Sequence, residues 1–176
     1  PEQSVHVPIP AVSHPREINF RGDEVVILTM KTQHTEAALE DLRLAAGDEV
    51  PLFCCQNGVA NERMALRRFQ NVHAMMVYLP AILLDPGTVL AHAARKSGVL
   101  DASIYPTGSN DLVAEVTASL NSVNFSARPN PTVMRFKYGK LIMNLGNALA
   151  AVAPPGDGTK DIRALMRAEA EAWFKA

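Results

Sequence analysis

The stretch VVILTMKTQHTEAALEDLRLAAGDEVPLFCCQNGV, residues 25–59, decides the fold. It contains two short apolar runs, Val25–Met30 and Val50–Cys55, which are typical of strands covered on both faces. Between them, Thr35–Ala46 has apolar residues at helical spacing, and Gly47 is a typical helix stop. The order strand, helix, strand predicts two parallel strands joined by a crossover helix.

The same alternation continues along the chain and then changes. Asn61–Phe69 has the pattern of a second helix, and Val72–Leu79 is a third apolar run. After a turn at Asp85-Pro86-Gly87, the segments Thr88–Ala93 and Val99–Tyr105 predict short antiparallel strands added to the sheet edge. The expected fold class is therefore α/β: an incomplete Rossmann-like parallel sheet with antiparallel edge strands.

The last part of the sequence is helical. Asn110 is a good N-cap for a helix over Asp111–Leu120. Beyond a Pro-Asn-Pro break, Val133–Val152 has a long helical pattern, and a last helix begins near Thr159. These segments predict the start of an all-helical C-terminal domain.

We place a domain boundary near Pro129. Residues 1–128 are expected to form a partial dinucleotide-binding Rossmann domain, and residues 129–176 the beginning of a helical substrate-binding and catalytic domain. The chain starts at Pro1 without a methionine and stops within a helical pattern. We therefore expect segments to be missing at both ends.

Composition excludes several classes of protein. The net charge is -1 and no long basic run occurs, which argues against nucleic acid and against an anionic membrane surface. The longest apolar runs, such as Ala74–Leu84, are too short to span a bilayer, and no signal peptide is visible. Cys54 and Cys55 are adjacent and badly placed to bridge, which is typical of buried thiols in a reducing cytoplasm. The sequence thus predicts a cytoplasmic protein.

Two polar clusters directly follow strands. Lys31 comes at the end of the first predicted strand, and Asn57-Gly58 follows the second one closely. Ligands of open parallel sheets bind outside the carboxyl ends of the strands, so both clusters face a common crevice. Taken alone, Lys31 could be a solvated loop charge and Asn57-Gly58 an ordinary turn. Together they favour a binding site.

A third polar cluster lies on the long helix. Lys140, Asn144 and Asn147 are spaced i, i+4 and i+7, which places all three on one face. Their neighbours are mostly apolar, so we expect this polar stripe to lie in an otherwise buried helix, where each polar group needs a partner. The alternative is a structural hydrogen-bond network. The five histidines show no metal-ligand spacing, and no metal site is predicted.

These elements resemble a known family. KTQHTEAAL (31–39), QNGV (56–59), DPGTV (85–89) and KYGKLIMNLGNALAA (137–151) recur in this order in ketopantoate reductases. The resemblance covers the chain up to about Ala151. Such enzymes have an N-terminal dinucleotide-binding domain and a C-terminal helical domain, with the active site in the cleft between them.

The resemblance implies a role for each candidate residue. Lys31 is similar to a lysine that contacts the cofactor, and Asn57 to an asparagine that contacts both cofactor and substrate. Lys140 is similar to the general acid, and Asn144 to an asparagine that binds substrate. Asn147 is expected to bind substrate as well. The implied reaction is the NADPH-dependent reduction of 2-dehydropantoate (ketopantoate) to pantoate, a step of pantothenate and coenzyme A synthesis.

Departures from the family pattern leave the substrate open. Family members often have a second helix asparagine where this chain has Ala148, with Asn147 one place earlier, and a glutamine where it has His34. The alternatives are a reductase of another 2-oxoacid and a non-catalytic dinucleotide-binding protein. The residues do not distinguish NADP from NAD, and a homodimer is compatible with them.

The chemistry of the residues agrees with the resemblance. Hydride attack on a 2-oxo group leaves negative charge on oxygen, and a lysine ammonium can stabilise this charge and donate a proton. The sequence contains no G-x-G-x-x-G turn for the pyrophosphate. We therefore expect the 176 residues alone to bind NADPH poorly and to be inactive.

Overall fold

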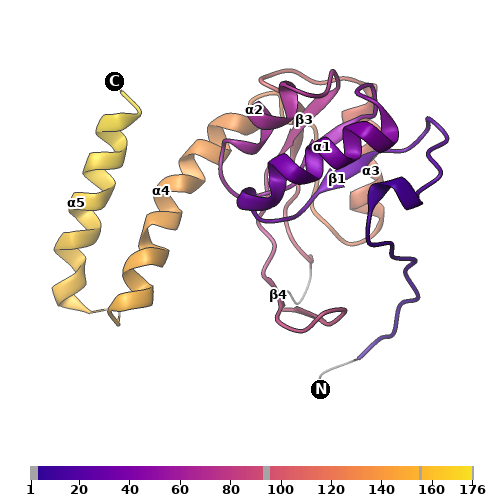
Figure 1. Ribbon diagram of the computed structural model, residues 1–176. Coiled ribbons are helices and arrows are strands. Elements are labelled where there is room, and N and C mark those ends of the chain that lie inside the picture. Colours follow the sequence, from indigo (N-terminus) through magenta and orange to yellow (C-terminus); the bar gives the residue numbers. More distant parts are fainter. Residues whose placement is uncertain (1–3, 93–95, 155, 176) are drawn as a thin grey trace.

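A four-stranded sheet forms the centre of the protein, which we describe from a computed structural model covering residues 4–92, 96–154 and 156–175. Its strands lie in the order β1 (Val26–Leu28), β2 (Leu52–Cys54), β3 (Val72–Met75), β6 (Ala102–Ile104). The first three are parallel, and β6 is antiparallel to β3 (Figure 1). This arrangement confirms the predicted α/β class with an antiparallel edge strand.

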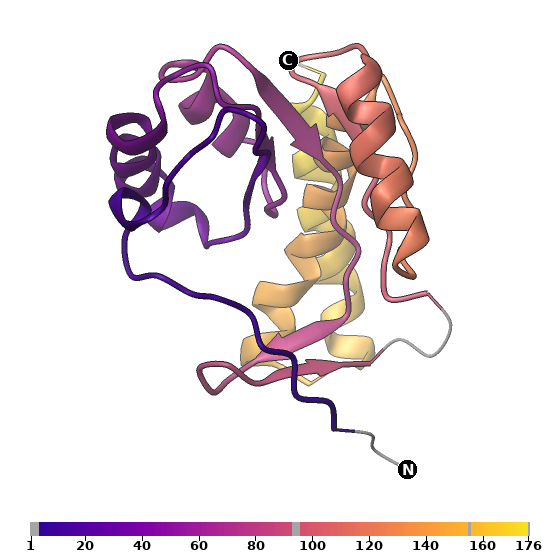
Figure 2. The same ribbon diagram turned by 90° about the vertical axis from the view of Figure 1, so that its right-hand side faces the viewer.

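Helices cover both faces of this sheet. The helices α1 (Thr35–Ala46) and α2 (Asn61–Leu66) lie on one face, and α3 (Asp111–Ser122) lies on the other (Figure 2). Because neighbouring strand residues point to opposite faces, Leu52 packs under α1 while Phe53 packs under α3. Burial of each such side chain contributes about 1.5–3 kcal/mol to folding.

The helix ends follow local chemistry. Gly47 ends α1 with φ 79°, a conformation that glycine adopts without strain. Asn110 caps α3, because its side-chain oxygen accepts a hydrogen bond from the backbone N–H of Val113 at 2.9 Å. The prediction for α2 was too long, since this helix ends at Leu66 and not at Phe69. Two short 3-10 helices, η1 (Pro15–Glu17) and η2 (Thr32–His34), precede α1.

A hairpin replaces one of the predicted edge strands. The strands β4 (Ala81–Leu83) and β5 (Val89–Ala91) pair with each other in a separate two-stranded sheet. The prediction that Thr88–Ala93 joins the edge of the main sheet is therefore wrong, and Ala93 itself lies outside the described residues. The turn at Asp85-Pro86-Gly87, with Gly87 at φ 81°, folds the chain directly back onto β4.

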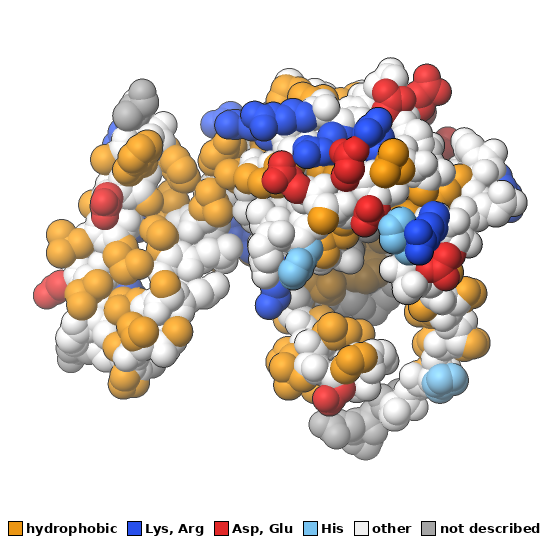
Figure 3. Space-filling model, viewed as in Figure 1, with side chains coloured by type: hydrophobic (Ala, Val, Ile, Leu, Met, Phe, Trp, Pro, Cys, Tyr) orange, Lys and Arg blue, Asp and Glu red, His pale blue; other side chains and the backbone are white. Residues whose placement is uncertain are grey.

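The two C-terminal helices, α4 (Val133–Val152) and α5 (Asp157–Trp173), pack side by side and extend away from the sheet (Figure 1). Val133 and Met134 anchor the start of α4 against β3. Further along, apolar side chains cover the outside of the pair (Figure 3), and Met143 is 64% exposed. The expectation of an otherwise buried helix is thus wrong for the second half of α4. No helix within the described ranges is long and apolar enough to cross a bilayer.

Candidate active site

The turn after β2 begins the candidate site. Asn57 and Gly58 follow the strand, and Gly58 takes φ 87°, so the chain reverses sharply before α2. The side-chain amide of Asn61, at the start of α2, donates a hydrogen bond to the backbone carbonyl of Asn57 at 3.0 Å. The backbone of the turn is therefore held in place, while the side chain of Asn57 remains available for other contacts.

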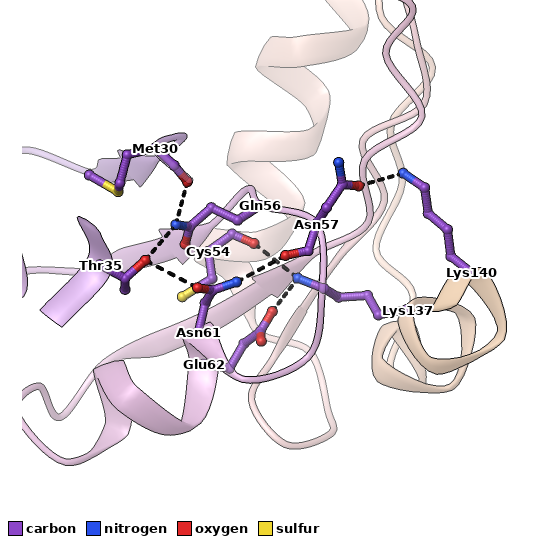
Figure 4. Close-up of polar contacts among 9 residues, drawn as sticks. All are labelled: Met30, Thr35, Cys54, Gln56, Asn57, Asn61, Glu62, Lys137 and Lys140. Atoms are coloured by element: carbon purple, nitrogen blue, oxygen red, sulfur yellow. Dashed lines mark hydrogen bonds and ion pairs between the residues drawn. The ribbon is translucent and has the colours of Figure 1, made fainter. Parts of the chain in front are cut away.

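A buried polar network supports this turn from below (Figure 4). The amide of Gln56 donates to the carbonyl of Met30 at 2.7 Å and to the hydroxyl of Thr35 at 2.9 Å. The Thr35 hydroxyl donates in turn to the side-chain oxygen of Asn61 at 3.1 Å. Because these residues come from the ends of β1 and β2 and the starts of α1 and α2, the network ties four elements together at one edge of the sheet.

Lys140 reaches this turn from α4. Its Nζ lies 2.7 Å from Oδ1 of Asn57 (Figure 4). This nitrogen also donates to the backbone carbonyl of Val77, just beyond β3. The same nitrogen lies 4.7 Å from the centre of the Tyr78 ring. The ammonium thus meets an amide oxygen, a carbonyl and an aromatic face, three groups that stabilise a cation.

The surroundings also change the acidity of this lysine. Burial lowers the pKa of Lys140 below its ordinary value, and the nearby charge of Lys137 lowers it further. Cys55 acts in the opposite direction. A lowered pKa makes the ammonium a better proton donor at neutral pH than an exposed lysine.

The other predicted residues divide into two groups. Asn144, one turn after Lys140, is half-buried and lines the same small cavity as Asn57 and Lys140. Asn147 is exposed and does not line this cavity. Lys31 is exposed in the loop after β1, and no hydrogen bond or ion pair joins it to Asn57 or Lys140 among the described residues. The structure therefore brings together Asn57, Lys140 and Asn144 only.

Sequence reasoning missed a buried ion pair beside the site. Lys137 of α4 contacts the carboxylate of Glu62 of α2, and their side chains are 3% and 0% exposed (Figure 4). The Nζ of Lys137 also lies 3.3 Å from the carbonyl of Cys54. One signal was present in the sequence: Lys137 lies three residues before Lys140 and therefore on the same helix face.

The two cysteines are free thiols at the end of β2. Cys54 is buried and Cys55 is half-buried. Burial raises the pKa of Cys54 to about 12, and a negative charge on Glu62 acts in the same direction. Cys54 is therefore a neutral thiol at physiological pH, as expected for a structural cysteine.

The fold and this site define a Rossmann-type domain joined to a helical segment. The profile of the ketopantoate reductase PanE/ApbA family matches residues 2–102, more than half of the chain. The chain therefore belongs to the ketopantoate reductase family.

Individual proteins are similar to this chain in sequence or in fold. The chain is 26% identical over 136 residues to 2-dehydropantoate 2-reductase of Pyrococcus horikoshii, covering 77% of this chain and 44% of the relative. It is similar in structure to a PanE/ApbA family ketopantoate reductase of Ralstonia eutropha, with a TM-score of 0.61 and 24% identity over 75% of this chain and 41% of the other. D-mandelate dehydrogenase with NADH and anilino(oxo)acetate shares the fold at a TM-score of 0.60 and 18% identity, over 74% of this chain and 41% of the other. The chain spans less than half the length of these relatives.

Proposed function

We propose that this chain supplies the nicotinamide side of an NADPH-dependent reductase that converts 2-dehydropantoate to pantoate, with Lys140 as the general acid. The observation that carries the proposal is the 2.7 Å contact between Lys140 Nζ and Asn57 Oδ1. It places a cation from α4 at the carboxyl end of β2, where ligands of open parallel sheets bind. Membership of the ketopantoate reductase family supports the same class of reaction.

The residues at this edge fit the nicotinamide end of a dinucleotide. Gly58 has no side chain, and a Cβ built there would come no closer than 4.0 Å to a neighbour, so a ligand can approach its backbone. Asn57 and Gly58 would hold the nicotinamide, and Lys31 would contact the cofactor from the loop after β1. When bound, the nicotinamide supplies the hydride. The choice of NADP over NAD follows the family resemblance and is part of the proposal.

The contacts of Lys140 suit proton donation. An ammonium has three N–H donors, and two of them point to Asn57 and to the Val77 carbonyl. One donor remains for the 2-oxo oxygen of the substrate. There, the positive charge stabilises the developing alkoxide, and the lowered pKa of Lys140 favours transfer of its proton to that oxygen.

The amides complete the proposed site. Asn57 orients Lys140 through its Oδ1, and its Nδ2 can donate to substrate or cofactor. Asn144 lines the same cavity and can bind the substrate carboxylate without adding charge. Asn147, although exposed in this structure, stays a predicted substrate-binding residue.

We also propose the division into residues 1–128 and 129–176. The backbone N–H of Asn130 still bonds to Ala102 of β6, and α4 begins three residues later. The chain thus leaves the sheet edge shortly after the proposed boundary. A cytoplasmic location belongs to the same proposal, because it suits an enzyme of small soluble substrates. A homodimer belongs to it as well, since a similar ketopantoate reductase from Staphylococcus aureus is dimeric.

The test is a reductase assay of the full-length gene product. NADPH and NADH are each combined with 2-dehydropantoate and with other 2-oxoacids, including bulky aromatic ones similar to the anilino(oxo)acetate found with D-mandelate dehydrogenase. We expect the highest kcat/KM with 2-dehydropantoate and NADPH. Lys140→Ala should lower kcat by about 10²–10⁴-fold, the usual contribution of a general acid, with little change in NADPH affinity. Lys160→Ala, at an exposed position of α5, is the control.

Each other outcome has a distinct meaning. Faster turnover of a different 2-oxoacid would replace the substrate and leave the role of Lys140 intact. A silent Lys140→Ala variant, or no turnover of any 2-oxoacid, would favour a non-catalytic dinucleotide-binding protein instead.

A further inference from the structure

The ion pair of Lys137 and Glu62 lies in the interior of the protein. Glu62 belongs to the first turn of α2 and Lys137 to the second turn of α4, 75 positions apart in the sequence. Removing two charges from water costs several kcal/mol for each ion, and only good mutual geometry offsets this cost. An apolar pair of the same volume would hold two helices together equally well. The charged pair therefore calls for a role beyond stability.

Both partners are next to residues of the proposed active site. Asn61, which holds the backbone of Asn57, is the residue before Glu62. Lys140 follows Lys137 at i+3, on the same face of α4. The first turn of α2 thus contacts Asn57 through Asn61 and Lys137 through Glu62 (Figure 4). A single turn of α4 carries both Lys137 and Lys140.

The contacts of Lys137 are directional. Its Nζ donates to the Glu62 carboxylate and, at 3.3 Å, to the Cys54 carbonyl, which belongs to β2. Two acceptors from two different elements, β2 and α2, restrain this nitrogen on α4. Apolar packing of Val133 and Met134 against β3 holds the helix but restrains rotation less strictly.

We propose that the buried pair of Lys137 and Glu62 is a positioning device that sets the rotation of α4, so that Lys140 meets Asn57 at the carboxyl end of β2. Lys137 lines the same cavity as Asn57 and Lys140, but its Nζ is engaged by the Glu62 carboxylate and the Cys54 carbonyl. Lys137 and Glu62 therefore act as positioning residues in this proposal. The consequence for catalysis rests on the proposed function, whereas the effect on the surroundings of Lys140 does not.

The test uses variants that separate position from stability. Lys137→Met/Glu62→Met removes both charges at similar volume, so the fold should be kept. Glu62→Asp keeps the charge but withdraws the carboxylate by one methylene, and it decides the question if the double variant does not fold. The control is Arg167→Met/Glu171→Met, which removes the exposed pair of α5 at 69% and 42% side-chain exposure.

Two readouts are compared after the melting temperature shows that each variant is folded. The first is kcat and KM of the full-length gene product. The second is the titration of Lys140, followed by its ¹³Cε chemical shift in lysine-labelled 176-residue chain. The charged and titratable groups that face Lys140 are Lys137 of α4, Cys55 at the end of β2 and Tyr78 after β3.

We expect both test variants to lose about a hundred-fold in kcat, because misplacement of a catalytic group by about 1 Å has effects of this size. KM for the cofactor should change little. The pKa of Lys140 should rise in the double variant, since Lys137 no longer repels its proton and the side chain is less desolvated. The control should change neither readout.

A folded double variant with wild-type kcat and wild-type Lys140 titration would overturn the proposal, as would a folded Glu62→Asp variant with wild-type kcat. Failure of the proposed function has a different signature: the wild-type gene product would then reduce no 2-oxoacid. In that case the Lys140 titration in Glu62→Asp, which keeps both charges, decides the role of the ion pair: an unchanged titration in this folded variant would overturn the proposal.

Discussion

The two halves of α4 lie in different surroundings. The first half is anchored: Val133 and Met134 pack against β3, and Lys137 is buried in an ion pair. The second half extends beside α5, with Met143 64% and Val152 83% exposed. Lys140 lies where these halves meet. Its half-buried position lets it contact the sheet on one side and leaves it accessible to a ligand on the other.

The difference between the two halves of α4 matters for the proposed function, because only the first half is held rigidly. A proposed catalytic group needs a fixed position, and the anchored half provides buried contacts from β2, β3 and α2. The second half contacts only α5 strongly, so its residues have few restraints. Substitutions in the anchored half should therefore have large effects, and substitutions on the exposed outside of the α4–α5 pair should have small ones.

The largest effect on stability is expected from Lys137→Met. This change leaves the Glu62 carboxylate buried without a counter-charge, and breaking a buried pair in this way costs about 3–5 kcal/mol. The free energy of unfolding of the 176-residue chain, measured by urea denaturation at pH 7, gives the effect directly.

A matched exposed pair gives the reference for this measurement. Arg167→Met breaks the contact with Glu171 on α5, and such surface pairs contribute about 0–1 kcal/mol. Equal losses for Lys137→Met and Arg167→Met would contradict the distinction between an anchored and an exposed region.

Thr35→Val tests the network below the Asn57 turn. Valine has nearly the same shape as threonine, but it removes the hydroxyl that accepts from Gln56 and donates to Asn61. The Asn61 oxygen would lose a buried partner, at a cost of about 1–3 kcal/mol. Urea denaturation measures this loss, and Thr88→Val, at an exposed position, should change stability little. A neutral Thr35→Val variant would contradict a stabilising role of this hydroxyl.

The helices that cover the sheet were largely predictable from local sequence. Gly47 and Asn110 mark helix ends because glycine and asparagine have specific backbone roles there. Strand-end topology predicted a site at Asn57, and only the family resemblance placed Lys140 in the same site. The structure has these two side chains in contact. The helix-end signals lie within a single element, and the site lies at the carboxyl edge of the sheet, where ligands of such sheets bind.

The parts that could not be predicted depend on contacts between distant residues. Nothing local pairs Lys137 with Glu62, and nothing local shows that the chain after Gly87 folds back onto β4. The spacing of Asn147 places it on the face of Lys140, but the spacing does not tell how far along α4 the contact with the sheet extends. Tertiary packing decides all three features.

His73 belongs to β3, the strand against which the first half of α4 packs. It is 3% exposed and stacks on Phe53 with ring centres 4.3 Å apart. Burial lowers the pKa of His73, while backbone groups of Leu52 and Asn71 partly oppose this shift. A histidine with a lowered folded-state pKa favours folding above its unfolded pKa of about 6.5. This contribution to stability declines as the pH falls from the unfolded pKa to the lower pKa of the folded state.

The expected outcome is a pH-dependent difference between wild type and His73→Phe. The stability of wild type relative to this variant should be lower at pH 5 than at pH 7.5. At pH 5 the imidazole of unfolded wild type binds a proton more readily than the buried imidazole does, which favours unfolding, and the variant has no such group. Urea denaturation at both pH values gives the comparison. The idea fails if the stability difference between wild type and His73→Phe is the same at both pH values.

The smallest effect is expected on the outside of the α4–α5 pair. Leu165 of α5 is 70% exposed, so Leu165→Gln removes little buried apolar surface and keeps a residue that favours helices. The free energy of unfolding of the chain should change by less than about 0.5 kcal/mol. Leu39→Ala, in the core under α1, should cost about 2–5 kcal/mol in the same experiment. A loss above about 1 kcal/mol for Leu165→Gln would show that this face of α5 is packed in solution, because an exposed side chain has no such surface to lose.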